Sequence, residues 1–327
     1  MLSLQVRSYS RSFRQPLHTA HGRWEQRTGL ILRLELETGS VTFGEIAPLP
    51  WFGTETLAQA QALCDRWPRH FTVDKIAEIP DTLPACQFGF GTARDRLSAK
   101  LPSEPPLSPS PADICALLPP GEAALTHWQP LWQQGHRTFK WKIGVASIDD
   151  ELSLLRDLAQ SLPPTARLRL DANGGLTATA AAAWLSACDR ASVAIEFLEQ
   201  PLPPDQIIDW LPQIAGQFGT PVALDESVAT LQQLRQVQQQ VNSQIVYVVK
   251  PAIAGFPQRL LDYCLEHQLD VVLSSALETP IGRTAALTLA QRLWAAGLPR
   301  RALGFGVDHW FIDDWVHCSE VDLWQQL

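Results

Sequence analysis

Residues 138–144 read TFKWKIG, an apolar stretch that carries two lysines, Lys140 and Lys142, two positions apart. Alternate residues of a β-strand share a face, so both ammonium groups point to one side while Trp141 and its apolar neighbours point to the other. Two interpretations fit this pattern. An edge strand can carry lysines into solvent, where they also discourage aggregation. Alternatively, the lysines face a polar site inside the protein, and the rest of the chain has to distinguish the two.

Similar apolar stretches recur along the second half of the chain, separated by segments with helical periodicity. Besides 138–144 they are ICALL (114–118), ARLRLDANG (166–174), VAIEFLEQP (193–201), TPVALDES (220–227), QIVYVVKPA (244–252), LDVVLSSALE (269–278) and RALGFG (301–306). Short apolar strands that alternate with helices are typical of a parallel sheet covered by those helices. Eight such strands predict a (β/α)₈-type barrel, whose active-site residues lie at the C-terminal ends of the strands.

The N-terminal part has a different pattern. Residues 1–50 alternate in the manner of antiparallel strands, with LILRLELETGSVTFGEIAPL holding two of them around the turn ETGS. A helix is expected from about Thr54. Residues 101–113, LPSEPPLSPSPAD, are rich in proline and serine and predict an exposed connection near a domain boundary.

Composition excludes several classes of function. The chain has 327 residues, 26 basic against 34 acidic side chains and no basic tract, so nucleic acid is an unexpected partner. No apolar run is long enough for a transmembrane helix and no signal peptide is recognisable, so we expect a cytoplasmic protein. The six cysteines form no CxxC pair and are expected to be free thiols, mostly buried. The eight histidines have no metal-ligand spacing, and His136 is expected to be structural.

Polar side chains follow successive apolar strands at intervals of about one strand–helix unit. They are Lys142, Asp171, Glu199, Asp225, Lys250 and Ser275. Each one alone fits a structural role, such as a turn, an exposed strand end or a helix N-cap. Partly buried charges are rarely left unpaired, however. Ionisable groups at this many consecutive strand ends therefore predict one shared site at the mouth of the barrel.

Three of these groups are carboxylates from neighbouring strands, without cysteine or histidine. An all-oxygen site of this kind suits Mg²⁺, with Mn²⁺ as the alternative. Lys142 on the second strand and Lys250 on the sixth would flank a small carboxylate substrate from opposite sides. Lys142 is thus a candidate base that removes a proton α to a carboxylate.

Five short motifs carry a family resemblance: KWK (140–142), DAN (171–173), EQP (199–201), DES (225–227) and KP (250–251). With them the chain resembles the enolase superfamily, in its muconate-lactonising-type branch. The resemblance implies an α+β capping domain over residues 1–98, completed by 307–327, on a (β/α)₈-type barrel over 99–306.

The resemblance also implies roles for individual residues. Asp171, Glu199 and Asp225 would bind Mg²⁺, and Lys142 and Lys250 would form the acid–base pair. Lys140, Asn173 and Glu226 would support them, Glu226 beside Lys250.

Within the branch, two segments most resemble the o-succinylbenzoate synthase family: GEIAPLPWFGTETL (44–57) and SSALETPIG (274–282). That family implies dehydration of 2-succinyl-6-hydroxy-2,4-cyclohexadiene-1-carboxylate to 2-succinylbenzoate, in menaquinone or phylloquinone biosynthesis. Ser274 and Ser275 would bind the succinyl tail. A racemase of N-acylamino acids or an epimerase of dipeptides is the alternative, and a non-catalytic binding barrel is a more distant one. A monomer or small homo-oligomer is expected. Phe256 replaces a glycine that often follows the sixth strand in this branch, and it either narrows the pocket or packs.

Overall fold

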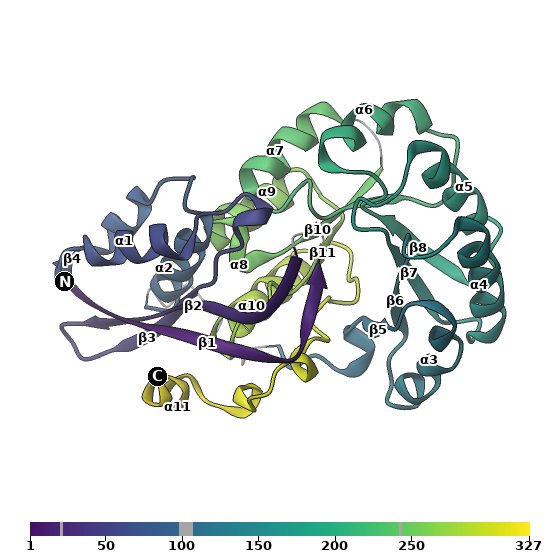
Figure 1. Cartoon of the computed structure of the whole chain (residues 1–327). Helices are drawn as coiled ribbons and strands as arrows, with labels where there is room; N and C mark the ends of the chain where they lie inside the picture. Colours follow the sequence, from purple (N-terminus) through teal and green to yellow (C-terminus); the bar gives the residue numbers. More distant parts are fainter. Residues whose placement is uncertain (20–21, 98–106, 242–243) are drawn as a thin grey trace.

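The computed structural model describes residues 1–19, 22–97, 107–241 and 244–327. Figure 1 shows a curled parallel sheet wrapped by helices, with the N-terminal strands and helices α1 and α2 beside it. None of the helices within these ranges is long and apolar enough to cross a membrane.

The parallel sheet contains seven strands in the order β11-β10-β9-β8-β7-β6-β5. The strands are β5 (Ala116–Leu118), β6 (Thr138–Lys142), β7 (Arg167–Asp171), β8 (Ala194–Glu199), β9 (Val222–Leu224), β10 (Ile245–Val249) and β11 (Val271–Leu273). The helices that follow them are α3 (Ala124–Gln133), α4 (Ile148–Ser161), α5 (Ala178–Cys188), α6 (Pro204–Ile214), α7 (Leu231–Gln240), α8 (Pro251–Ala254), α9 (Pro257–Glu266) and α10 (Pro280–Ala295). The predicted barrel of alternating parallel strands and helices is confirmed over seven strands, and its first strand is β5.

The prediction of an extended eighth strand is wrong. Residues 301–306 form only two isolated parallel bridges, Ile114 with Leu303 and Ser274 with Gly304. These bridges still join the two edges of the sheet. A Cβ on Gly304 would lie 2.6 Å from the Ser274 hydroxyl oxygen. Glycine permits this close approach but weakens a strand, so the closing segment stays short.

Strand β6 answers the question raised by its lysines. It lies between β5 and β7, so the edge-strand interpretation is wrong. Phe139, Trp141 and Ile143 are fully buried in the main core between the sheet and the outer helices, and Trp141 meets Trp184 of α5 edge-on. Lys140 and Lys142 therefore face the inside of the barrel, by the alternation of the strand.

The N-terminal strands form an antiparallel sheet in the order β3-β2-β1-β4. Its strands are β1 (Leu2–Thr19), β2 (Gly22–Leu36), β3 (Val41–Ile46) and β4 (His70–Phe71), with helices α1 (Leu57–Asp65) and α2 (Pro84–Leu97). The expected turn and helix are both present. Thr56 and Gln59 form a capping box that starts α1.

The C-terminal segment returns to this sheet. In Figure 1, helix α11 (Glu320–Gln326) lies beside β1. Leu323 and Trp324 of this helix share a small core with Tyr9, Ile31 and Phe43. Short 3₁₀ helices complete the structure: η1 (Pro50–Phe52), η2 (Val73–Glu78), η3 (Pro111–Asp113), η4 (Gly121–Ala123), η5 (Asp308–Trp310) and η6 (Trp315–His317). The predicted boundary at 98/99 and residues 101–106 of the proline-rich connection lie outside the described residues, and the division at 98 and 307 stays a prediction.

Candidate active site

A cavity of about 230 Å³ lies at the C-terminal ends of the parallel strands. It contains most of the predicted site residues. They are Lys140, Asp171, Asn173, Glu199, Asp225, Glu226, Lys250, Ser274 and Ser275. Gly304 and Gly306 of the closing segment, Phe52 of η1, and Val307 and Trp310 of the C-terminal segment complete the wall. The charged residues come from the barrel, whereas the apolar side chains come both from its strands, with Leu117, Val248 and Val272, and from the loops above it.

Lys140 joins two of the carboxylates. Its ammonium nitrogen lies 2.6 Å from Asp171 Oδ2 and 2.7 Å from Glu199 Oε1. The register explains this meeting, because Asp171 and Glu199 are direct neighbours across β7 and β8. Burial alone would lower the pKa of Lys140, but the Asp171, Glu199 and Asp225 carboxylates together hold it above its usual value. Lys140 is thus a fixed positive charge.

Lys250 pairs with the third carboxylate. Its ammonium group donates a hydrogen bond to Asp225, and both side chains are buried. The Phe52 ring covers it, with its centroid 4.5 Å from the ammonium nitrogen. A cation over an aromatic face gains electrostatic stabilisation, most of all when it is desolvated. The loop carrying η1 therefore contributes directly to the environment of Lys250.

The negative charges of Glu199 and Glu226 are not fully compensated by the two ammonium groups. Burial and the negative charges of Asp171 and Asp225 raise the pKa of Glu199 to about 8, against the opposing effect of Lys140. Burial and the Asp225 charge likewise raise the pKa of Glu226 to about 7. Glu226 accepts a hydrogen bond from Asn173 Nδ2 at 3.2 Å. The site therefore holds more carboxyl groups than its two ammonium groups can neutralise.

Lys142 differs from the other predicted residues. It is the last residue of β6, pairs in register with Asp171, and its side chain is exposed above the cavity rather than lining it. Within the described part of the chain its ammonium group has no ion-pair partner. The loop that follows is held by Glu151, whose carboxylate accepts the backbone N–H groups of residues 144–146. Lys142 is thus free to reach a bound molecule.

The residues fit a hard divalent cation. No three acidic, histidine or cysteine side chains of the described residues are gathered at metal-binding distance, because Lys140 and Lys250 lie between the carboxylates and pair with them. The donor set is nevertheless all oxygen, it carries an excess of carboxyl groups, and Glu226 Oε2 is buried without a hydrogen-bond partner. Oxygen-rich, anionic sites of this kind suit Mg²⁺.

The two serines after β11 lie in the wall of the cavity, as predicted. Ser275 is already engaged: its hydroxyl donates to Glu278 Oε2 at 3.0 Å and accepts from the Leu277 N–H at 2.9 Å. Leu277 has a positive φ of 62° and also lines the cavity. This segment is therefore held by its own hydrogen bonds.

The sequence reasoning missed several wall residues. Phe52, Leu277 and Trp310 belong to loops, where no periodicity marks them. Arg169 could have been predicted from strand alternation, because it precedes Asp171 by two residues on β7. Its Nε donates a hydrogen bond to Glu196 at 2.6 Å, and its Nη2 is buried without a hydrogen-bond partner. Phe256 does not line the cavity but packs in the core beside α2, which decides between the two interpretations of that residue.

Comparison with family models covers both parts of the chain. Residues 1–97 match the model described as MenC, N-terminal domain, and residues 124–317 match the model described as Enolase C-terminal domain-like. The chain is 46% identical over 314 residues to an o-succinylbenzoate synthase of Thermosynechococcus vestitus, covering 94% of this chain and 92% of the relative. It is 30% identical over 289 residues to that of Yersinia pseudotuberculosis serotype O:1b, covering 85% and 83%.

Comparison with solved structures indicates the same family. The o-succinylbenzoate synthase of Thermosynechococcus elongatus, complexed with Mg in the active site, matches with a TM-score of 0.87 and 41% identity, over 99% of this chain and 100% of that one. A substrate-liganded L-Ala-D/L-Glu epimerase from Bacillus subtilis matches with a TM-score of 0.76 over 95% and 91% of the two chains, but at 19% identity it shows the shared fold alone. The chain belongs to the o-succinylbenzoate synthase family of the enolase superfamily.

Proposed function

We propose that this protein is an o-succinylbenzoate synthase, a lyase that dehydrates 2-succinyl-6-hydroxy-2,4-cyclohexadiene-1-carboxylate to 2-succinylbenzoate in menaquinone or phylloquinone biosynthesis. The observation that carries the proposal is the placement of the lysines. Strand β6, which bears Lys142, and strand β10, which precedes Lys250, lie on either side of the three strands that end in Asp171, Glu199 and just before Asp225. A substrate held above those carboxylates would meet a lysine on each face.

In this proposal Asp171, Glu199 and Asp225 hold Mg²⁺. When bound, the ion supplies positive charge that stabilises negative charge developing on the substrate carboxylate. Lys250 adds a second positive charge on the opposite face from Lys142. Its ammonium group pairs with Asp225 and lies over the Phe52 ring.

Lys142 performs the proton transfers. As a neutral amine it takes the proton from the carbon α to the carboxylate, and the electron pair of that C–H bond moves toward the carboxylate. The resulting ammonium group then returns the proton to the departing hydroxyl group, so that the C–O bond breaks and water leaves. The ring becomes aromatic and Lys142 is again neutral. The exposed position of Lys142 at the end of β6 suits both transfers.

A racemase or epimerase is the second candidate, because lysines on both faces also suit proton exchange between two enantiomers. A dipeptide epimerase would need a carboxylate in the late strands to hold the substrate ammonium group. Glu278 is the acidic residue of that segment, but it is buried and accepts the Ala276 N–H at 2.7 Å and the Ser275 hydroxyl. It is therefore turned toward its own loop, which favours the dehydratase.

The test is a dehydration assay. Purified protein would receive the cyclohexadiene carboxylate with Mg²⁺ and, separately, with EDTA. Rapid Mg²⁺-dependent loss of the diene absorbance is expected. Absence of turnover, together with deuterium exchange at the α-carbon of N-acylamino acids or dipeptides, would move the assignment to a racemase or epimerase. The cytoplasmic location and the monomeric or small homo-oligomeric state stay predictions.

A further inference from the structure

Two loops from distant parts of the chain each contribute an apolar side chain to the wall of the active-site cavity. Residues 47–53, after β3, carry Phe52, and residues 274–279, after β11, carry Leu277. One loop belongs to the N-terminal part and the other to the barrel. Because both side chains line the same cavity, the relative position of the two loops affects its shape.

Arg27 of β2 joins these loops. Its guanidinium group donates from Nε to the Ala276 carbonyl at 3.0 Å, from Nη1 to the Pro48 carbonyl at 2.9 Å, and from Nη2 to the Ala47 carbonyl. A further bond from Nη1 reaches the Thr28 carbonyl at 3.1 Å. One side chain thus holds the base of both wall loops.

The environment of Arg27 is unusual for a charged residue. The side chain is 1% exposed, and no carboxylate among the described residues lies within ion-pairing distance of it. Burying a guanidinium group is costly unless its donors are satisfied. Here carbonyl oxygens satisfy them, and the planar fork of arginine can reach several carbonyls where the single ammonium group of lysine cannot.

The barrel loop needs such a constraint. Leu277 adopts a left-handed conformation, which is unfavourable for a residue other than glycine. Its neighbours are fixed from the N-terminal part: Arg27 binds the Ala276 carbonyl, and Arg11 donates to the Glu278 carbonyl at 3.0 Å. Leu277 then packs with Phe13 in a small cluster at the cavity. The conformation of this wall residue is therefore maintained by these long-range contacts together with the hydrogen bonds within the loop.

We propose that Arg27 is a positioning residue that sets the distance between the Phe52 and Leu277 walls, and so determines how tightly the cavity holds the apolar ring and methylene groups of its substrate. The identity of that substrate rests on the proposed function. Arg27 does not touch the reacting atoms in this proposal. It acts through the two loops.

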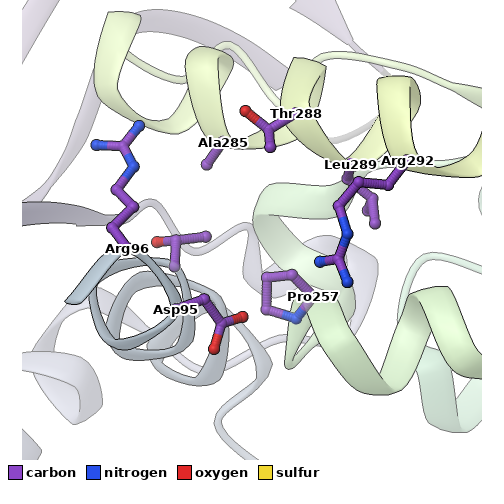
Figure 2. Close-up of a pocket in the computed structure, with 8 residues that line it drawn as sticks. Asp95, Arg96, Pro257, Ala285, Thr288, Leu289 and Arg292 are labelled. Atoms are coloured by element: carbon purple, nitrogen blue, oxygen red, sulfur yellow. The ribbon is translucent and has the colours of Figure 1, made fainter. Parts of the chain in front are cut away.

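A partly buried arginine at another contact of the N-terminal part provides a control. Figure 2 shows a groove between α2 and α10, with Arg96 on one side and Arg292 on the other. Arg96 pairs with Glu320 of α11 and has no bond to either wall loop. Arg96→Lys therefore makes the same chemical change as Arg27→Lys, also between the N-terminal part and a distant segment, without altering the wall.

Hydrogen–deuterium exchange of the full chain, followed by mass spectrometry, tests the proposal without using activity. Arg27→Lys is expected to increase amide exchange at least tenfold in peptides covering 47–53 and 274–279, while peptides from β6 to β10 keep wild-type rates. Arg96→Lys is expected to leave both loops unchanged. Faster exchange in one loop only, in neither, or along the whole chain would overturn the proposal.

Steady-state kinetics distinguish a role of Arg27 in substrate binding from a role in the chemical step. With wild-type enzyme active in the dehydration assay, Arg27→Lys should raise KM about tenfold or more and leave kcat within threefold. An unchanged KM would overturn the proposal. If the wild-type enzyme does not turn over this substrate, the proposed function fails while the exchange result still decides the role of Arg27. Loss of the global fold in both Arg27→Lys and Arg27→Gln would show a general structural role and would also overturn it.

Discussion

Glu199→Gln is expected to stabilise the protein in EDTA at pH 7, although it removes a residue proposed to bind the metal. In the folded protein, burial and the charges of Asp171 and Asp225 raise the pKa of Glu199 from 4.5 to about 8. The folded state therefore retains a proton that the unfolded state has released at pH 7. By linkage, the contribution of Glu199 to the unfolding free energy is most favourable below about pH 4.5 and becomes less favourable as pH rises toward 8.

The magnitude follows from the shift. Each pH unit between the two pKa values costs about 1.4 kcal/mol, so Glu199 lowers the unfolding free energy by about 1 kcal/mol at pH 5 and about 3 kcal/mol at pH 7. Glutamine keeps the shape and can still accept the hydrogen bond from Lys140, but it has no proton to lose. The stability difference between Glu199→Gln and wild type should thus grow with pH, to a Tm difference of about 4 °C at pH 7 for a chain of this length.

Thermal unfolding followed by circular dichroism at pH 5, 6 and 7 measures this difference. Glu122→Gln, at an exposed position, is the matched control and should show no growing difference. With excess Mg²⁺ the order should reverse, because only the wild type can provide the ionised Glu199 carboxylate. A variant that is less stable than wild type in EDTA at pH 7, or a difference that does not grow with pH, would refute the reasoning.

Three further changes test other parts of the structure. Lys142→Ala should lower kcat at least about 10³-fold in the dehydration assay, since a general base is lost, while the circular dichroism spectrum stays unchanged. Gln200→Leu should lower the unfolding free energy by about 3 kcal/mol in urea titrations, because the buried amide oxygen accepts the Asp225 N–H at 3.1 Å and its NH₂ group has two further partners. Glu45→Gln should cost about 2 kcal/mol in the same assay and speed amide exchange in the first turn of α10, because the carboxylate accepts the Thr279 N–H at 2.9 Å at that N-terminus. An unchanged urea midpoint for either variant would contradict its assigned role.

The barrel could be predicted from the sequence because its determinants are local. Each strand is a short apolar run followed by a polar residue, and parallel pairing then brings the strand ends together without further information. Asp171 and Glu199 are direct neighbours across β7 and β8 for this reason. The prediction of an extended eighth strand was wrong where the local signal was weakest, at a segment of six residues containing Gly304 and Gly306.

The ion pairs within the site were harder to predict from the sequence. The sequence indicated three carboxylates with a lysine on either side, but not that Lys140, rather than Lys142, lies between Asp171 and Glu199. Both lysines share a face of β6, and only the height of each along the barrel axis separates a partly buried charge from an exposed one. That height depends on the stagger of all the strands, which no single segment encodes.

The contacts that hold the apolar wall could not be predicted from the sequence, for a physical reason. Arg27 and Ala276 are separated by 249 residues, and nothing in either segment identifies the other as its partner. A buried arginine bound to carbonyl oxygens leaves no charge pattern in the sequence, since its partners are backbone atoms that every residue possesses. The chemistry of this protein is thus encoded in side chains at strand ends, where motifs record it, whereas the shape of its cavity depends on backbone contacts between distant segments. Members of one superfamily can therefore share every strand-end residue and still differ in substrate, because the residues that set the cavity width are under no requirement to form a motif.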